Sequence, residues 1–193
     1  NRFRLTSGAA TRWRDAAMLR RASKGLDLSI HDLTEKEAVI GVMGGGSRQM
    51  LSQMSDGPWG EFAFSTCHPV SISAQALNAT RMSFVGEPGW ELYIPVASAG
   101  AVFDALIAAG AKPMGHYALD GCRLEKGFCH WGHDLGPEIT PLQAGLGFAV
   151  DWSKDFIGKA ALEAECKAGV ARRLCLVQIE GQPLILHDEL IRE

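Results

Sequence analysis

Two carboxylates flank a Pro-Gly pair near the middle of the chain and could bind a flat, nitrogen-rich ligand. Glu87 and Glu91 lie on either side of Pro88-Gly89. A carboxylate accepts two hydrogen bonds side by side, and such charge-assisted bonds are strong. On a strand face beside a concave surface, Glu91 would suit a heterocycle with adjacent N–H donors, whereas Glu87 should face water. Periodicity alone favours a plainer interpretation, an exposed strand glutamate without a ligand.

A run of three glycines before a serine is a second candidate site. A glycine turn that feeds a helix can bind phosphate, because bare N–H groups and the helix dipole point at the anion. The Lys-Ser/Thr pair of a P-loop does not follow Gly44-Gly45-Gly46-Ser47, and no GxGxxG with a downstream acid is present. We therefore interpret this segment as a tight turn, with Ser47 as a plausible helix N-cap.

Cysteine and histidine gather in a third segment. Cys129, His130 and His133 are close in sequence, with Cys122 upstream, but their spacing matches no common zinc pattern. Packing within one turn is favoured, and a metal-binding module stays as an alternative. The chain has five cysteines without a CxxC pair, so a disulfide framework is not expected. A reducing compartment fits better, either the cytoplasm or, in a eukaryote, the mitochondrial matrix.

Composition limits the partners. The formal net charge is −3 with scattered Lys and Arg, which argues against nucleic acid and anionic membrane surfaces. No apolar run approaches the ~20 residues of a membrane span, and the first residues lack the apolar core of a signal peptide.

Hydrophobic periodicity and turn residues predict an α+β fold that positions these candidates. The expected helices span residues 10–23, 47–54, 98–109, 117–125 and 160–168. The expected strands span residues 3–6, 38–43, 70–73, 74–85, 90–95, 147–152, 172–180 and 184–190, with residues 86–89 as a hairpin turn. Alternation along residues 90–95 places Glu91 and Tyr93 on one face and Trp90 and Leu92 on the other.

Several ordered segments resemble one family. Residues 81–93 are similar to the Tyr-Thr-Gly-Glu-x-Gly-aromatic-Glu signature of the glycine-cleavage T-protein, or aminomethyltransferase, family. Residues 115–127 resemble that family's Leu-Arg-Leu-Glu-Lys-Gly helix. Residues 130–146 most resemble the C-terminal folate part of dimethylglycine and sarcosine dehydrogenases, and residues 155–162 and 2–8 match in the same order. The chain is identified as a member of this family.

The resemblance implies a partial aminomethyltransferase folate-binding domain with tetrahydrofolate as its cofactor. Glu91 matches the glutamate that binds the pteridine ring. Phe84 stands where the family often has a tyrosine over the folate, which keeps the stacking face but loses the hydroxyl. Tyr93 and Arg123 complete the predicted folate-binding set, and a structural ion pair of Arg123 with Glu125 is the alternative.

Two departures from the family pattern limit what the resemblance implies. Leu119 replaces an arginine that meets the folate tail in T-proteins, so the resemblance does not imply recognition of the tail by this helix. The family's catalytic aspartate should precede Asn1, so no catalytic residue is predicted here. The chain is then expected to be an internal fragment, with a folate-binding domain at residues 1–170 and the first strands of a truncated C-terminal β-barrel at residues 171–193.

The implied activity of the parent protein is tetrahydrofolate-dependent aminomethyl or methylene transfer, in glycine cleavage or N-methylglycine degradation. Its implied partner is either a flavin dehydrogenase domain of the same parent chain, which would hold FAD, or a lipoyl carrier protein. The alternative is a non-enzymatic folate-binding or regulatory protein of the same fold. One such branch, in iron–sulfur cluster assembly, carries Lys-Gly-Cys, whereas Lys126-Gly127-Phe128-Cys129 places the cysteine one position later.

Overall fold

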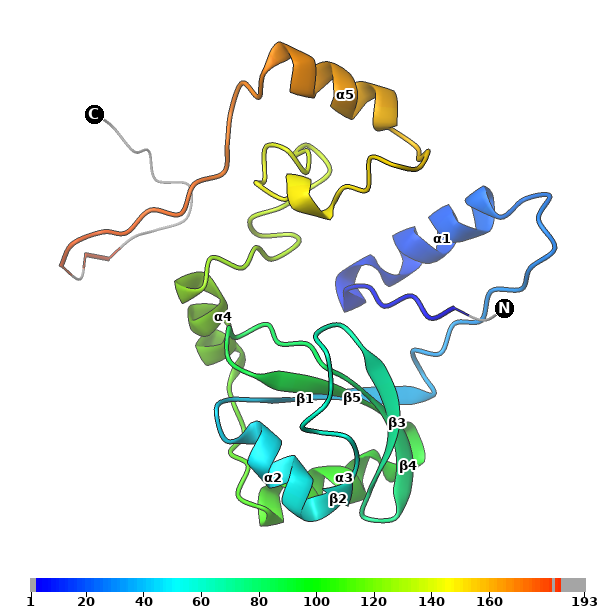
Figure 1. The fold of residues 1–193 in the computed structure, drawn as a ribbon, viewed down its shortest axis with the longest axis vertical. Coiled ribbons are helices and arrows are strands. Elements are labelled where there is room, and N and C mark those ends of the chain that lie inside the picture. Colours follow the sequence, from blue (N-terminus) through cyan, green and yellow to red (C-terminus); the bar gives the residue numbers. More distant parts are fainter. Residues whose placement is uncertain (1–2, 182, 185–193) are drawn as a thin grey trace. The chain divides into compact units, whose positions relative to one another are not determined.

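A computed structural model describes residues 3–181, 183 and 184 of the chain. They form two compact units, one within residues 1–128 and one within residues 129–193. Figure 1 shows the path of the chain through both. Each unit is described by itself.

The first unit is built on an antiparallel sheet of five strands. The order across the sheet is β1-β5-β4-β3-β2, so the last strand in sequence lies between β1 and β4. The strands are β1 (Glu37–Met43), β2 (Ser55–Asp56), β3 (Cys67–Ile72), β4 (Gln75–Thr80) and β5 (Gly89–Pro95). A central β5 is fixed from both sides, which suits a strand that carries a site.

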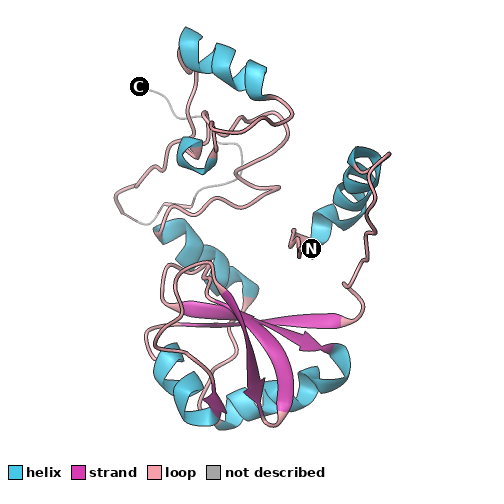
Figure 2. Ribbon diagram, turned by 45° about the vertical axis from the view of Figure 1, so that its right-hand side comes forward, coloured by secondary structure: helices cyan, strands magenta, loops and turns pink. Residues whose placement is uncertain are grey.

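Two helices cover one face of this sheet, α2 (Ser47–Met54) and α3 (Val96–Ala108) (Figure 2). The side chains of Trp90, Leu92 and Ile94 are fully buried against them, at every second position of β5. Burial of each large apolar side chain contributes about 1.5–3 kcal/mol. Since alternate residues of a strand point to opposite faces, Glu91 and Tyr93 lie on the other face, as predicted.

The remaining helices of the first unit are the 3-10 turn η1 (Ala9–Thr11), α1 (Arg12–Ala22) and α4 (His116–Glu125). Helix α1 has no buried residue, and ion pairs of Arg12 with Asp32 and Glu35, at 2.9 and 2.6 Å, join it to the loop that follows. Helix α4 lies on the side of the sheet opposite to α2 and α3 (Figures 1 and 2).

The second unit contains the 3-10 turn η2 (Gly147–Ala149) and α5 (Lys159–Ala168), joined by long irregular segments. None of its described residues is buried, so this part of the chain has no hydrophobic core of its own. Within the described part of the chain, no helix is long and apolar enough to cross a membrane.

The α+β class and the predicted helices are confirmed, and several predicted strands are wrong. Residues 3–6 and 172–180 form no strand, and residues 147–152 hold η2 instead. These runs have strand-like composition, but a strand also needs a partner. With the described part of the chain, residues 172–180 make one backbone bond, from Leu174 N to Gln143 O at 2.9 Å. The predicted strand 184–190 lies outside the described residues after Leu184. A domain boundary near residue 171 stays a prediction.

The connection between β4 and β5 also differs from the prediction. Strand β4 ends at Thr80 and not at Val85, so residues 81–88 form a longer loop instead of a four-residue hairpin turn at 86–89. Ser47 is the first residue of α2 and not its N-cap, which is Gly46. Both corrections arise from contacts between distant segments.

Candidate functional site

The loop of residues 81–88, which we call the signature loop, is fixed at its end by the glycine turn. Gly44 N donates to Pro88 O at 2.8 Å. The Ser47 hydroxyl lies 3.1 Å from Pro88 O and 2.6 Å from Gly44 O. A Cβ on Gly89 would lie 2.7 Å from Met43 Cγ, so only glycine fits there without a shift. The glycine turn thus has a structural use, as the tight-turn interpretation predicted.

The start of the signature loop is fixed to the loop that precedes β3. Arg81 exchanges two backbone hydrogen bonds with the preceding loop: its N donates to Thr66 O at 3.0 Å, and its O accepts from Ser65 N at 2.9 Å. The Arg81 guanidinium donates to Phe62 O. With both ends held, the loop has a defined course from β4 to β5.

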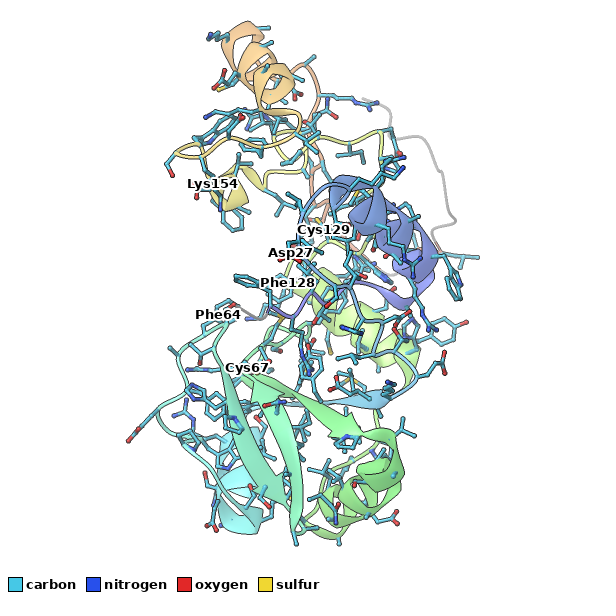
Figure 3. The ribbon with its side chains drawn as sticks, turned by 90° about the vertical axis from the view of Figure 1, so that its right-hand side faces the viewer. Asp27, Phe64, Cys67, Phe128, Cys129 and Lys154 are labelled. Carbon is cyan, nitrogen blue, oxygen red and sulfur yellow. The ribbon has the colours of Figure 1, made fainter. Side chains whose placement is uncertain are left out.

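The middle of the signature loop lies against the end of α4. Gly86 has a φ of +76°, and a Cβ there would lie 1.9 Å from Lys126 Cγ. The rings of Phe84 and Phe128 stack at 6.4 Å between centroids and 23° between planes. Phe128, labelled in Figure 3, follows α4 directly and is 40% exposed. The loop and the Lys126-Gly127-Phe128 segment therefore form one continuous surface.

Glu91 lies two residues into β5, on the sheet face opposite to the core. Its carboxylate is half-buried and accepts a hydrogen bond from the Tyr93 hydroxyl, with 2.7 Å from the Tyr93 oxygen to Oε2. Its cross-strand neighbours are Gly41 on β1 and Thr80 on β4. Gly41 presents no side chain beside Glu91, and the Met43 methyl would lie 3.1 Å from a Cβ built on Gly41.

Tyr93 is set deeper than the carboxylate that it contacts. It is 7% exposed, and the Arg4 guanidinium lies 4.9 Å from its ring centroid while pairing with Glu37 at 2.8 Å. Burial raises the pKa of Tyr93, and the hydrogen bond to Glu91 raises it further. Tyr93 is therefore a neutral donor at ordinary pH, and it fixes one oxygen of Glu91.

Arg123 is buried in the protein and does not pair with Glu125. It is 3% exposed, and its Nε donates to Asp120 at 2.7 Å while Nη1 donates to Phe128 O at 3.1 Å. Phe128 N returns a bond to Arg123 O at 2.9 Å. The predicted ion pair with Glu125 is therefore wrong, because Arg123 pairs with Asp120 instead. The hydrogen bonds between Arg123 and Phe128 hold the residue whose ring stacks on Phe84. Contact of Arg123 with folate stays a prediction.

The cysteine and histidine segment forms a turn. The rings of His130 and His133 stack at 4.7 Å, and His130 N donates to the Asp134 carboxylate at 2.8 Å. Among the described residues, no three His, Cys, Asp or Glu side chains are grouped to hold a metal ion. The five cysteines are free thiols.

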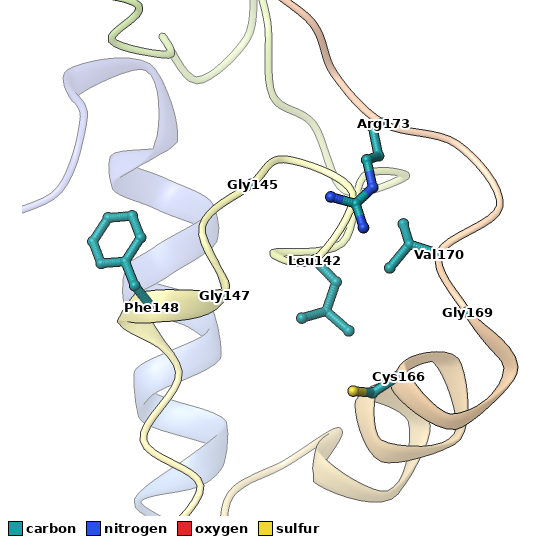
Figure 4. A pocket seen from close by; sticks show the side chains of 8 residues that line it. All are labelled: Leu142, Gly145, Gly147, Phe148, Cys166, Gly169, Val170 and Arg173. Atoms are coloured by element: carbon teal, nitrogen blue, oxygen red, sulfur yellow. The ribbon is translucent and has the colours of Figure 1, made fainter.

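The second unit holds an open cavity of about 460 Å³ (Figure 4). Its lining residues are Leu142, Gly145, Gly147, Phe148, Cys166, Gly169, Val170 and Arg173. Ligand sites of this size usually present several convergent polar groups. Only Arg173 and Cys166 offer polar side-chain atoms here, and none of the predicted site residues lines the cavity.

The fold and the signature loop define the class of protein. The sequence profile of the GCVT N-terminal domain matches residues 1–154, and the chain belongs to this family. A crystal structure of the glycine cleavage system aminomethyltransferase T from Bartonella henselae superposes with a TM-score of 0.74 at 25% identity, covering 84% of this chain and 45% of that one. The predicted family and fold are thus confirmed.

Individual relatives are of two kinds. The chain is 38% identical to 4-methylaminobutanoate oxidase (formaldehyde-forming) of Paenarthrobacter nicotinovorans, over 99% of this chain and 24% of that protein. It is 40% identical to the mitochondrial sarcosine dehydrogenase of Homo sapiens, over 78% of this chain and 17% of that protein. It is 33% identical to an aminomethyltransferase of Rubrobacter xylanophilus, over 96% of this chain and 50% of that protein. The chain thus spans half or less of these relatives.

Proposed function

We propose that this chain binds tetrahydrofolate through Glu91, as part of a protein that transfers a one-carbon unit. The observation that carries the proposal is the half-buried Glu91 carboxylate, held by Tyr93 at 2.7 Å on the sheet face opposite to the core. A fixed carboxylate can accept two adjacent N–H donors of a pteridine, and such bonds contribute about 1.5–3 kcal/mol each.

The residues around Glu91 also support a flat aromatic ligand. Gly41 leaves one flank of the carboxylate without a side chain of its own. Phe84 and Phe128 offer aromatic rings at the signature loop, and aromatic rings stack well on flat heterocycles. Bound tetrahydrofolate would supply the nitrogen atoms that accept the one-carbon unit. The contribution of this chain is to bind and orient tetrahydrofolate.

The names of the relatives suggest two classes of donor for the one-carbon unit. Names such as sarcosine dehydrogenase and 4-methylaminobutanoate oxidase point to an N-methyl amine, oxidised by a flavin domain of the parent protein. The name aminomethyltransferase points to an aminomethyl group, delivered by a lipoyl carrier protein. The higher identities, 38% and 40% against 33%, support the N-methyl amine class.

Calorimetric titration of the 193-residue chain with tetrahydrofolate tests the proposal. We expect binding in the wild type and a loss of about 10- to 100-fold in Glu91→Gln, because a neutral amide cannot accept charge-assisted bonds at both atoms. Glu87→Gln is the matched control, since Glu87 lies in the same segment and is exposed. Equal affinities in the two variants, or no binding by the wild type, would contradict the proposal.

A further inference from the structure

Lys126 lies across the signature loop in a way that fixes its side chain. A Cβ on Gly86 would lie 1.9 Å from Lys126 Cγ and 2.5 Å from both Cδ and Cε. The lysine stem therefore runs over the bare backbone of Gly86, at a position where any other residue would displace it. This contact orders three methylene groups of a side chain that usually samples many rotamers.

The ammonium group at the end of this ordered stem has no protein partner among the described residues. Lys126 is exposed, and its backbone N donates to Cys122 O at 3.3 Å, but its ammonium makes no hydrogen bond or ion pair with the described residues. The other cations near the site are occupied: Arg4 by Glu37, Arg81 by Phe62 O and Arg123 by Asp120. Lys126 is thus an ordered positive charge at the signature loop that is available to an anionic ligand.

The separation of Gly86 and Glu91 along the chain is short enough for one ligand to reach both. Gly86 precedes Glu91 by five residues, which span at most about 18 Å when fully extended. Tetrahydrofolate has an aminobenzoyl ring between its pteridine and its glutamyl carboxylates, so one molecule can reach both residues. The aromatic pair Phe84 and Phe128 belongs to the same surface as Lys126.

We propose that Lys126 binds a glutamyl carboxylate of tetrahydrofolate, and so recognises the tail of the ligand. The inference rests on the proposed function, because it assumes that Glu91 holds the pteridine. It assigns tail recognition to the end of α4, whereas Leu119 within α4 carries no charge. Ordering of the stem before binding reduces the entropy lost when the ammonium meets the carboxylate.

A lysine stem that covers backbone without binding anything is the plain alternative, because long side chains often cover nearby surface in this way. The test must therefore keep the stem and remove the charge. Lys126→Met does this, since methionine is unbranched and of similar length. Lys112→Met is the matched control, because Lys112 is exposed in the same unit but lies in the connector before α4.

Each variant of the 193-residue chain is titrated with tetrahydrofolate and with 6-methyltetrahydropterin, which has the reduced pteridine but no glutamyl tail. We expect Lys126→Met to weaken tetrahydrofolate about 5- to 10-fold, the scale of one partly exposed charge-assisted bond, and to change 6-methyltetrahydropterin less than about 2-fold. Added salt should weaken tetrahydrofolate more than the pterin in the wild type. Lys112→Met should change neither.

Unchanged tetrahydrofolate affinity in Lys126→Met would overturn the inference while leaving the role of Glu91 standing. Equal losses for both ligands would overturn it too, because they would show a structural effect on the pteridine site. Failure of the proposed function looks different: neither ligand binds the wild type, or Glu91→Gln binds both as well as the wild type does.

Discussion

The Tyr93 hydroxyl, 2.7 Å from the Glu91 carboxylate, distinguishes this glutamate from the exposed acids elsewhere on the chain. Glu87, only four residues away, is exposed and has no partner in the described structure. A carboxylate with one oxygen fixed presents the other lone pairs in a set direction, which is what a bidentate ligand requires. The candidate site is therefore a pair, in which Tyr93 fixes one oxygen of Glu91.

The coupling within this pair is measurable by titration, because the chain has only two tyrosines, Tyr93 and Tyr117. In a Tyr117→Phe background, tyrosinate absorbance reports Tyr93 alone. We expect its pKa above the ordinary value of about 10, owing to burial and to the bond with Glu91. Glu91→Gln should lower that pKa, and burial should keep it above 10.

The same titration predicts how stability depends on pH. The folded-state pKa of Tyr93 exceeds its unfolded value, so the stability from this contact is complete below about pH 10 and is lost as pH rises through the folded pKa. A Tyr93 pKa that does not respond to Glu91→Gln would contradict the assigned contact.

Single elements show what could be predicted from the sequence and what could not. Helix α2 and strands β1 and β5 follow directly from apolar periodicity and glycine positions, as does the pairing of Glu91 with Tyr93 on one face. The sequence motif also identified the signature loop, but not its course, because that depends on contacts with distant residues such as Ser47 and Lys126. Local patterns carry no information on such partners.

The absence of information on distant partners also explains the wrongly predicted strands and the contacts at the candidate site that were not predicted. Residues 172–180 have the composition of a strand, yet no second strand lies beside them in the described structure. Lys126 and Phe128 were part of a recognised segment, but nothing in their spacing indicates that they meet Gly86 and Phe84. A positive φ requirement at Gly86 was the one available signal, since glycine is the residue that adopts it freely.

The turn between β3 and β4 holds two residues in left-handed backbone conformations. Two residues, Ser73 and Ala74, join the strands with φ of +51° and +60°, values that favour Asn and Gly. Ala74→Gly should raise the free energy of unfolding by about 0.5–1 kcal/mol, because it relieves left-handed strain. Urea denaturation measures this.

Ala63→Gly is the control for that substitution, since Ala63 is exposed and its φ is not positive. It should lower the free energy of unfolding by a similar amount, because glycine gains more freedom in the unfolded chain. Destabilisation by Ala74→Gly would show that the turn is not in the conformation described.

The whole molecule concentrates its core in the first unit. Every buried residue among the described ones precedes residue 129, and all five strands lie there too. A segment with its own sheet and core can fold independently, whereas a unit without buried side chains has little stability of its own. The candidate site, from Gly41 to Phe128, belongs entirely to this first unit.

We therefore expect residues 1–128 alone to fold and to unfold cooperatively, with a thermal midpoint within about 4 °C of that of the 193-residue chain, roughly the shift that 1 kcal/mol produces in a domain of this size. Circular dichroism on both proteins provides the comparison. Loss of cooperative unfolding in residues 1–128 would show that the second unit supplies essential packing.

A crystal structure of the chain soaked with tetrahydrofolate would show whether Glu91 anchors a pteridine. The expected result is a pteridine whose N–H donors lie about 2.7–2.9 Å from the Glu91 carboxylate oxygens, the usual distance of charge-assisted bonds. Tetrahydrofolate bound instead in the cavity lined by Leu142, Phe148 and Arg173, with Glu91 free of ligand, would contradict the claim.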